Sequence, residues 1–200
     1  EICNTLDDDC NGLIDDGVTE TITIEASGTT TVCQGESVLL NATYSGTAVQ
    51  WKKNGVIIAG ATADTYTATA TGIYTCETSS DCATNLSNAI SVTVNKNPKA
   101  SITAGGPTTF CEGGSVTLTE TLVGGATYQW FKGGASIGRA TTNVYVATTS
   151  GNYKCRVTKT ATGCIKMSNA IAVLVTFKEG ENMSANNWKI YPNPANDNLV

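Results

Sequence analysis

The chain has 200 residues, of which 40% are hydrophobic and only 14% are charged. This length is enough for one large domain or two small domains with packed cores. The formal net charge of -5 provides no overall basic surface for phosphate groups, so the composition excludes nucleic acid as an expected partner. The absence of histidine excludes catalytic triads, imidazole bases and histidine metal sites. The composition therefore favours a protein that is not an enzyme.

The first 18 residues contain an acidic segment with the spacing of a calcium-binding loop. Oxygen-bearing side chains stand at loop positions 1, 3, 5 and 9, glycine stands at position 6, and Ile14 stands at position 8. Position 12, where a bidentate glutamate is usual, is Val18, so the last ligand must come from Asp16, Glu20, water or a neighbour. The predicted Ca2+ ligands are Asp7, Asp9, Asn11, Asp15, Asp16 and the backbone carbonyl of Leu13.

This segment resembles the metal-binding motif of many secreted bacterial surface proteins, sometimes called the MopE type. The resemblance covers residues 1–18 and is carried by Cys3-Asn4, Asp7-Asp8-Asp9-Cys10-Asn11-Gly12 and Ile14-Asp15-Asp16-Gly17. Cys3 and Cys10 flank the start of the loop. We expect a disulfide between them, because a short closure would preorganise the ligands in a segment that has no core of its own.

The middle of the chain contains two copies of one domain, residues 20–95 and residues 99–176, joined by a linker at residues 95–98. Five features recur between them at offsets of 78 to 81 residues. These features are Cys33, Trp51, Tyr74, Cys76 and Ser87-Asn88-Ala89, which recur as Cys111, Trp130, Tyr153, Cys155 and Ser168-Asn169-Ala170. Alternating apolar residues, such as Val38, Leu40 and Ala42, predict strands between turns rich in Gly and Asn. We call residues 20–95 the first repeat and residues 99–176 the second repeat.

Each repeat resembles an immunoglobulin-like domain. The resemblance is carried by Gly35-x-Ser37-Val38-x-Leu40, Gln50-Trp51 and Gly72-x-Tyr74-x-Cys76, and by Ser115-Val116-x-Leu118, Gln129-Trp130 and Gly151-x-Tyr153-x-Cys155. It implies an all-β fold of two tandem sandwiches. Trp51 and Trp130 are then the core residues of strand C, and Tyr74 and Tyr153 form the tyrosine corners before strand F.

The eight cysteines form an even set without zinc-type spacing, which favours disulfides and an oxidising compartment. The usual strand B partner of the strand F cysteine is absent, because that position is Ala42 in the first repeat and Glu120 in the second. Either each repeat holds one internal bridge and one buried thiol, or an unpaired cysteine cross-links to a neighbouring domain or chain. The pairing is therefore open for Cys33, Cys76, Cys82, Cys111, Cys155 and Cys164.

The acidic residues outside the calcium loop are scattered along the chain. They include Glu36, Asp64, Glu77, Asp81, Glu112 and Glu120. We expect them to be surface and turn residues, which argues against catalysis by paired carboxylates.

Residues 177–200 comprise a polar linker followed by a proline-containing segment. The sequence Tyr191-Pro192-Asn193-Pro194-Ala195 resembles the start of the sorting domain that the type IX secretion system recognises in Bacteroidota. The resemblance implies that the secretion machinery is a partner and that the protein is extracellular or lies on the outer-membrane surface. The longest apolar run, residues 170–177, is too short for a membrane helix. Both ends look cut, so we expect a piece of a longer protein.

Taken together, these patterns predict a non-catalytic extracellular module with a structural or adhesive role. It would form a calcium-stabilised stalk or the subunit of a self-assembling surface fibre, in which copies associate by strand addition or through disulfides. The alternative is that these residues are the spacer region of a larger secreted hydrolase whose catalytic domain lies upstream of residue 1.

Overall fold

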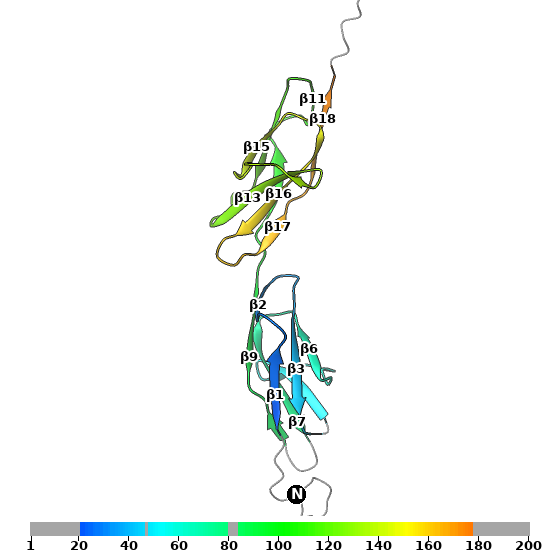
Figure 1. Cartoon of the computed structure of the whole chain (residues 1–200), viewed down its shortest axis with the longest axis vertical. Coiled ribbons are helices and arrows are strands. Elements are labelled where there is room, and N and C mark those ends of the chain that lie inside the picture. The colour runs from blue at the N-terminus through cyan, green and yellow to red at the C-terminus, as the bar shows by residue number, and fades with distance from the viewer. Residues whose placement is uncertain (1–20, 47, 80–83, 178–200) are drawn as a thin grey trace, which may run out of the picture. The chain divides into compact units, whose positions relative to one another are not determined.

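The computed structural model describes residues 21–46, 48–79 and 84–177 (Figure 1). These residues form strands numbered β1 to β18 and no helix, so the predicted all-β fold is confirmed. They divide into two compact units. The first unit contains the chain up to Lys99 together with Val123–Thr127 and Val157–Lys166, and the second contains Ala100–Leu122, Tyr128–Arg156 and the residues from Met167.

The first repeat contains two sheets. The smaller sheet has the order β1 (Ile22–Ala26), β3 (Val38–Tyr44), β6 (Thr65–Ala68). The larger sheet has the order β2 (Thr31–Cys33), β9 (Ile90–Asn95), β7 (Gly72–Ser79), β4 (Ala48–Lys53), β5 (Val56–Ile57), and β8 (Thr84–Leu86) also pairs with β7.

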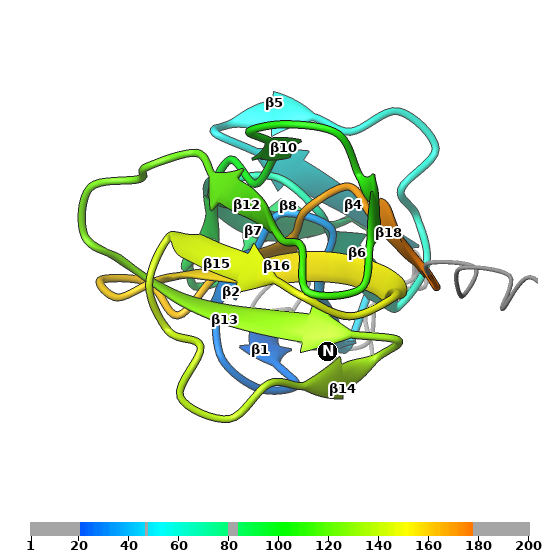
Figure 2. The same cartoon turned by 90° about the horizontal axis from the view of Figure 1, so that it is seen from above.

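The second repeat has the same arrangement. Its smaller sheet has the order β10 (Ile102–Ala104), β12 (Val116–Glu120), β15 (Val144–Ala147). Its larger sheet has the order β11 (Thr109–Cys111), β18 (Ile171–Thr176), β16 (Gly151–Lys159), β13 (Ala126–Lys132), β14 (Ala135–Ser136), and β17 (Ile165–Met167) also pairs with β16. Figure 2 shows β16, β13 and β14 following one another across this sheet.

This topology is that of the immunoglobulin-like sandwich. In the first repeat, β1, β3 and β6 correspond to strands A, B and E, and β4, β7 and β9 correspond to strands C, F and G of the other sheet. The pairs β1–β3, β3–β6, β4–β7 and β7–β9 are antiparallel. By contrast, β2 runs parallel to β9, and β11 runs parallel to β18.

Each sandwich has its own core, built by the period-2 alternation of its strands. Val38 and Leu40 in β3 are buried, whereas Leu39 between them is 43% exposed. Successive side chains of a strand point to opposite faces, so the apolar residues of one face of each sheet meet inside the sandwich. Full burial of each such side chain stabilises the fold by about 1.5–3 kcal/mol.

Two tryptophans and two tyrosines occupy the positions predicted from the repeat. Trp51 and Trp130 are both fully buried. Their indole Nε1 atoms donate hydrogen bonds of 2.8 and 2.9 Å to the carbonyl oxygens of the residues twelve positions later. The hydroxyls of Tyr74 and Tyr153 each donate a 2.8 Å hydrogen bond to the backbone carbonyl four residues upstream, which is the tyrosine corner. The predicted roles of these four residues are confirmed.

The repeated Ser-Asn-Ala triplet connects the two sheets of each sandwich. Asn88 lies just before β9, yet its Oδ1 accepts a hydrogen bond from the backbone N of Ile24 in β1, and its Nδ2 donates to the carbonyl oxygen of Ile24. Asn169 makes the same pair of bonds to Ile102 in β10. Strand β1 lies at the edge of its sheet, so the asparagine satisfies backbone groups that have no neighbouring strand.

Candidate functional site

Two of the predicted sites lie outside the described residues. These are the calcium loop, with its ligands and the Cys3 and Cys10 pair, and the sorting signal at residues 191–195. Cys82 also lies outside them. Within residues 21–46, 48–79 and 84–177, no group of three or more Cys, Asp or Glu side chains is placed to hold a metal ion. In the same residues no helix is long and apolar enough to cross a membrane.

One disulfide is described, and it joins Cys33 to Cys164, 131 residues apart. Both cysteines belong to the first compact unit, although Cys33 comes from the first sequence repeat and Cys164 from the second. Of the two alternatives derived from the sequence, this bond fits a link to a neighbouring repeat. An internal bridge in the second repeat is wrong, because Cys111 and Cys155 are both free thiols. Their potential partner Cys164 is already bonded outside that repeat.

The strand F cysteines are buried thiols without an oxidised partner. Burial raises the pKa of Cys76 to about 11 and that of Cys155 to about 12. A thiol needs to ionise to act as a nucleophile or metal ligand, so neither cysteine is reactive near neutral pH. Each backbone N of these cysteines donates a 2.9 Å hydrogen bond to a serine Oγ, from Ser87 or Ser168 of the repeated triplet.

Glu120 corrects the expectation that the acidic residues outside the loop lie on the surface. Its side chain is fully buried at the end of β12, in register with Ile102. Its Oε1 accepts hydrogen bonds from the backbone N of Ser101 and Thr121, at 2.6 and 2.9 Å. Its Oε2 has no hydrogen-bond partner. Burial raises the pKa of the Glu120 carboxyl, and hydrogen bonds from these two backbone N atoms partly oppose the shift.

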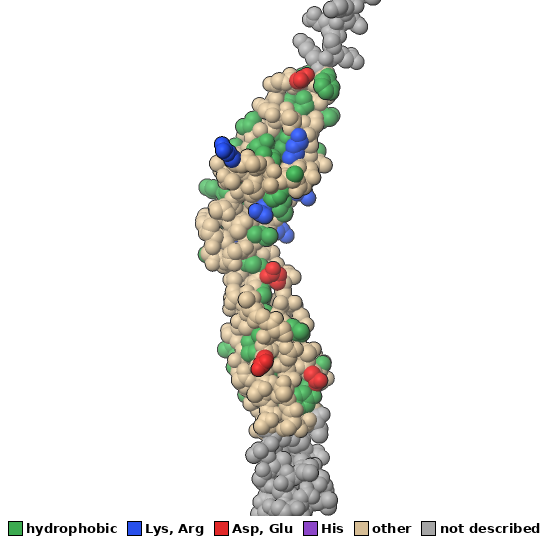
Figure 3. All heavy atoms as spheres, in the orientation of Figure 1, with side chains coloured by type: hydrophobic (Ala, Val, Ile, Leu, Met, Phe, Trp, Pro, Cys, Tyr) green, Lys and Arg blue, Asp and Glu red, His purple; other side chains and the backbone are tan. Residues whose placement is uncertain are grey.

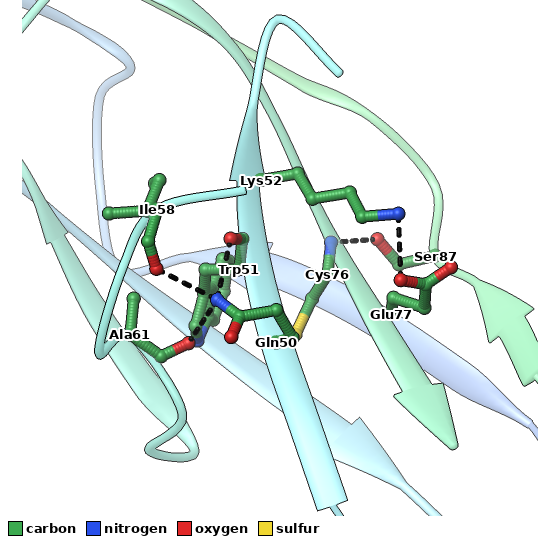
Figure 4. A network of polar contacts seen from close by, with 8 residues as sticks. All are labelled: Gln50, Trp51, Lys52, Ile58, Ala61, Cys76, Glu77 and Ser87. Atoms are coloured by element: carbon green, nitrogen blue, oxygen red, sulfur yellow. Dashed lines mark hydrogen bonds and ion pairs between the residues drawn. The ribbon is translucent and has the colours of Figure 1, made fainter. Parts of the chain in front are cut away.

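In the first repeat, a polar network lies along β4 and β7 (Figure 4). The Gln50 Nε2 atom donates to the carbonyl oxygens of Ile58 and Ala61, at 2.8 and 3.2 Å, and so fixes the loop after β5. On the outward face of the same sheet, Lys52 Nζ lies 2.7 Å from Glu77 Oε2. Lys52 and Glu77 therefore form an ion pair, in which the two opposite charges neutralise each other.

The second repeat has different side chains at the positions of that ion pair. With the offset of 79 residues, Phe131 stands where Lys52 stands in the first repeat, and Arg156 stands where Glu77 stands. The Arg156 guanidinium lies over the Phe131 ring, 5.5 Å from its centroid. This cation–π contact orients the arginine and leaves its charge without an acidic partner.

A recess of about 620 Å3 lies beside this contact, on the larger sheet of the second repeat. It is formed by β13, the turn before β14, β16, β17 and the residues that precede β18. Its lining residues are Phe131, Gly133, Gly134, Asn152, Lys154, Met167 and Ala170, all within the second compact unit. Recesses of this size, with apolar walls and a few polar groups, are typical of small-ligand sites. This recess is the candidate functional site.

The two repeats also differ strongly in charge. The first repeat contains six Asp and Glu and two Lys, whereas the second contains seven Lys and Arg and two Glu. On the face drawn in Figure 3, blue Lys and Arg side chains lie on the second repeat, whereas red Asp and Glu side chains lie on the first repeat and also at the end of the second repeat next to the grey residues. Because one of the two glutamates of the second repeat is the buried Glu120, the exposed part of this repeat is even more basic.

The recess was not predicted from the sequence, although two signals for it are present there. One is the opposite charge of the two repeats, which the net charge of the whole chain conceals. The other is the replacement of Lys52 and Glu77 by Phe131 and Arg156 at matched positions of otherwise similar repeats. Both signals become visible when the repeats are compared residue by residue and not only at their shared aromatics and cysteines.

A comparison with protein-family models finds no match, and neither does a comparison with curated proteins. Among solved structures, the chain is similar to murine CEACAM1b, with 20% identity over 78% of this chain and 100% of the other, at a TM-score of 0.35. It is similar to the tandem Ig repeats of Dlar, with 14% identity over 80% of this chain and 98% of the other, at a TM-score of 0.33. It is also similar to the human OSCAR ligand-binding domain, with 16% identity over 76% of this chain and 97% of the other, at a TM-score of 0.34.

Proposed function

We propose that the chain is a non-catalytic extracellular module of immunoglobulin type with a structural or adhesive role. In this proposal it forms a stalk or the subunit of a surface fibre, reaches the outside through type IX secretion and is stabilised by Ca2+ at the acidic loop. The observation that carries the extracellular assignment is the Cys33–Cys164 disulfide. Such bonds persist in oxidising compartments and are rare where thiols are kept reduced.

The chemistry of the described residues supports a role without catalysis. The two thiols of the sandwich cores, Cys76 and Cys155, have raised pKa values and are shielded from solvent. The buried acid Glu120 is held inside a sandwich by hydrogen bonds from two backbone N atoms. In the second repeat, the negative charge of Glu120 adds to the effect of burial in raising the pKa of Cys155, which keeps this thiol protonated and unsuited to act as a nucleophile.

The intact mass of the native secreted species, measured with and without reductant, tests this proposal against its alternative. A fibre held by disulfides gives a ladder of masses that collapses to one chain on reduction. A spacer of a larger hydrolase gives a single, much heavier chain whose mass changes only by the protons gained on reduction. A native species that stays monomeric in the presence of calcium, at the mass of this chain, contradicts self-assembly.

Calorimetric titration of the full chain with CaCl2 tests the calcium part separately. Asp9→Asn removes a carboxylate at a predicted ligand position, so we expect it to weaken Ca2+ binding, since the charge of the ligands sets the affinity of such loops. Asp8→Asn is the matched control, because it removes the same charge from an adjacent position that is not a predicted ligand. Equal loss in both variants would show that only the overall negative charge matters.

A further inference from the structure

The recess of the second repeat combines a basic rim with an apolar wall. Lys154 lines the recess from β16, and Arg156 lies two residues along the same strand, so both side chains point to the same face of the sheet. Among the described residues, no acidic side chain forms an ion pair with either of them. Two uncompensated cations beside a recess favour an anionic ligand.

The backbone around the recess limits what kind of ligand can bind there. The recess lies on the face of the sheet, where β16 is paired with β13, β17 and β18 and the backbone groups of these strands already bond to one another. A peptide that binds a sheet as an added strand needs free backbone groups at an edge. A ligand on this face meets the side chains of these strands and the Gly133–Gly134 turn, and a saccharide, which hydrogen-bonds through its hydroxyls, needs no free strand edge.

The side chains in the recess suit an acidic sugar. Phe131 and Met167 offer apolar surface for the carbon face of a sugar ring, and the Asn152 amide offers a donor and an acceptor for hydroxyls. Gly133 and Gly134 have φ of 56° and 93°, and a Cβ added to either would meet no atom within 4 Å, so this turn leaves open space above the recess. The planar guanidinium of Arg156 matches a carboxylate with two parallel hydrogen bonds.

We propose that this recess binds a carboxylate-bearing oligosaccharide, with its carboxylate between Lys154 and Arg156 and its ring against Phe131. The inference rests on the proposed extracellular adhesive role and specifies the class of ligand that the module holds. At the matched positions of the first repeat, Lys52 and Glu77 form an ion pair in place of the Phe131–Arg156 contact. Binding therefore belongs to one repeat of the pair.

The test is calorimetric titration of the full chain with a hexamer of galacturonic acid as the probe. We expect binding at millimolar or lower concentration that weakens when NaCl is added, because exposed charges are screened by salt. Arg156→Gln and Lys154→Gln should each weaken binding about tenfold or more, the loss expected for a hydrogen bond to a charged group. Circular dichroism of each variant shows that the fold is retained.

Arg139→Gln is the matched control. Arg139 is exposed, belongs to the same repeat and does not line the recess, so its replacement removes the same charge without touching the site. Binding of the probe by this variant should match that of the unchanged chain. A loss equal to that of Arg156→Gln would overturn the proposal, because it would mean that only net charge attracts the probe.

Three further results would overturn the proposal. The first is no binding of the hexamer at millimolar concentration, and the second is equal binding of a neutral galactose hexamer. The third is equal or tighter binding of an aspartate hexamer, which would mean that the recess recognises negative charge and not a sugar. None of them bears on the masses of the secreted species with and without reductant. Failure of the ligand assignment is therefore distinct from failure of the proposed structural role.

Discussion

Replacement of Glu120 by glutamine isolates the energetic cost of a buried carboxylate. The substitution keeps an oxygen for the hydrogen bonds from the backbone N of Ser101 and Thr121 but removes the charge. Because burial raises the pKa of Glu120 in the folded state, the folded protein binds a proton that the unfolded chain releases above its ordinary pKa of 4.5. The stability of the unchanged protein therefore falls as pH rises from 4.5 through the raised pKa.

The expected magnitude follows from the oxygen that has no partner. A buried polar atom without a hydrogen bond costs about 1–3 kcal/mol, and the cost is larger when the group is charged. Oε2 of Glu120 is such an atom, so ionisation of this carboxyl adds a further cost of the same order. The glutamine amide at the same place carries its own cost, but that cost does not change with pH. We therefore expect the free energy of unfolding of Glu120→Gln, relative to the unchanged protein, to increase by about 1–3 kcal/mol between pH 4 and pH 8.

Urea unfolding followed by tryptophan fluorescence measures this difference. Both proteins carry Trp51→Phe and Trp188→Phe, so that Trp130, in the core of the second repeat, is the only reporter. Glu112→Gln serves as the control because Glu112 is an exposed glutamate of the same repeat. Parallel curves of stability against pH for Glu120→Gln and the unchanged protein would refute the assignment of a raised pKa to Glu120.

Three further predictions concern the cysteines and the core. In the native protein, N-ethylmaleimide at pH 7.5 should modify the exposed Cys111 and leave the buried Cys76 and Cys155 unmodified. Peptide mass mapping reads the result, and modification of all three thiols at one rate would contradict the burial of Cys76 and Cys155. Trp130→Ala should lower the free energy of unfolding by about 3–5 kcal/mol, whereas a loss below 1 kcal/mol in urea would mean that this side chain is not packed. Cys33→Ser should lower the free energy of unfolding of the oxidised protein by about 2–4 kcal/mol, as measured by calorimetry, and leave that of the reduced protein unchanged. An equal loss in both states would exclude the disulfide as the cause.

The sandwich fold could be predicted because its signals are local and occur twice. Trp51 and Tyr74 keep their spacing in the second repeat, and each takes part in a contact that its own strand or turn determines. The repeated Ser-Asn-Ala triplet was found in the same way, but its role was not, because Asn88 bonds to Ile24, 64 residues earlier in the chain. A bond over that distance has no local signature.

The cysteine pairing and the buried acid depend on long-range packing and could not be derived from the sequence. The sequence places Cys164 near a turn of the second repeat but does not reveal that Cys33, 131 residues away, is its partner. The position of Glu120 in its strand predicts a side chain that faces the core, whereas its acidic type predicts an exposed side chain, because acidic residues are rarely buried. The alternation of β12 decided the outcome.

The parallel pairing of β2 with β9 gives the first repeat resistance to pulling. Strand β1 begins the repeat and β9 ends it, and β2 is joined to β9 by hydrogen bonds that include Thr93 N to Thr30 O and Gln34 N to Asn95 O, both 2.8 Å. A force that draws the two ends of a parallel pair apart loads these bonds in shear, so they share the tension and do not open one after another. The second repeat has the same device in β11 and β18, where Leu174 N donates to Thr108 O and Glu112 N donates to Thr176 O. In the proposed stalk, tension on either sandwich would therefore be shared among the hydrogen bonds of its parallel pair.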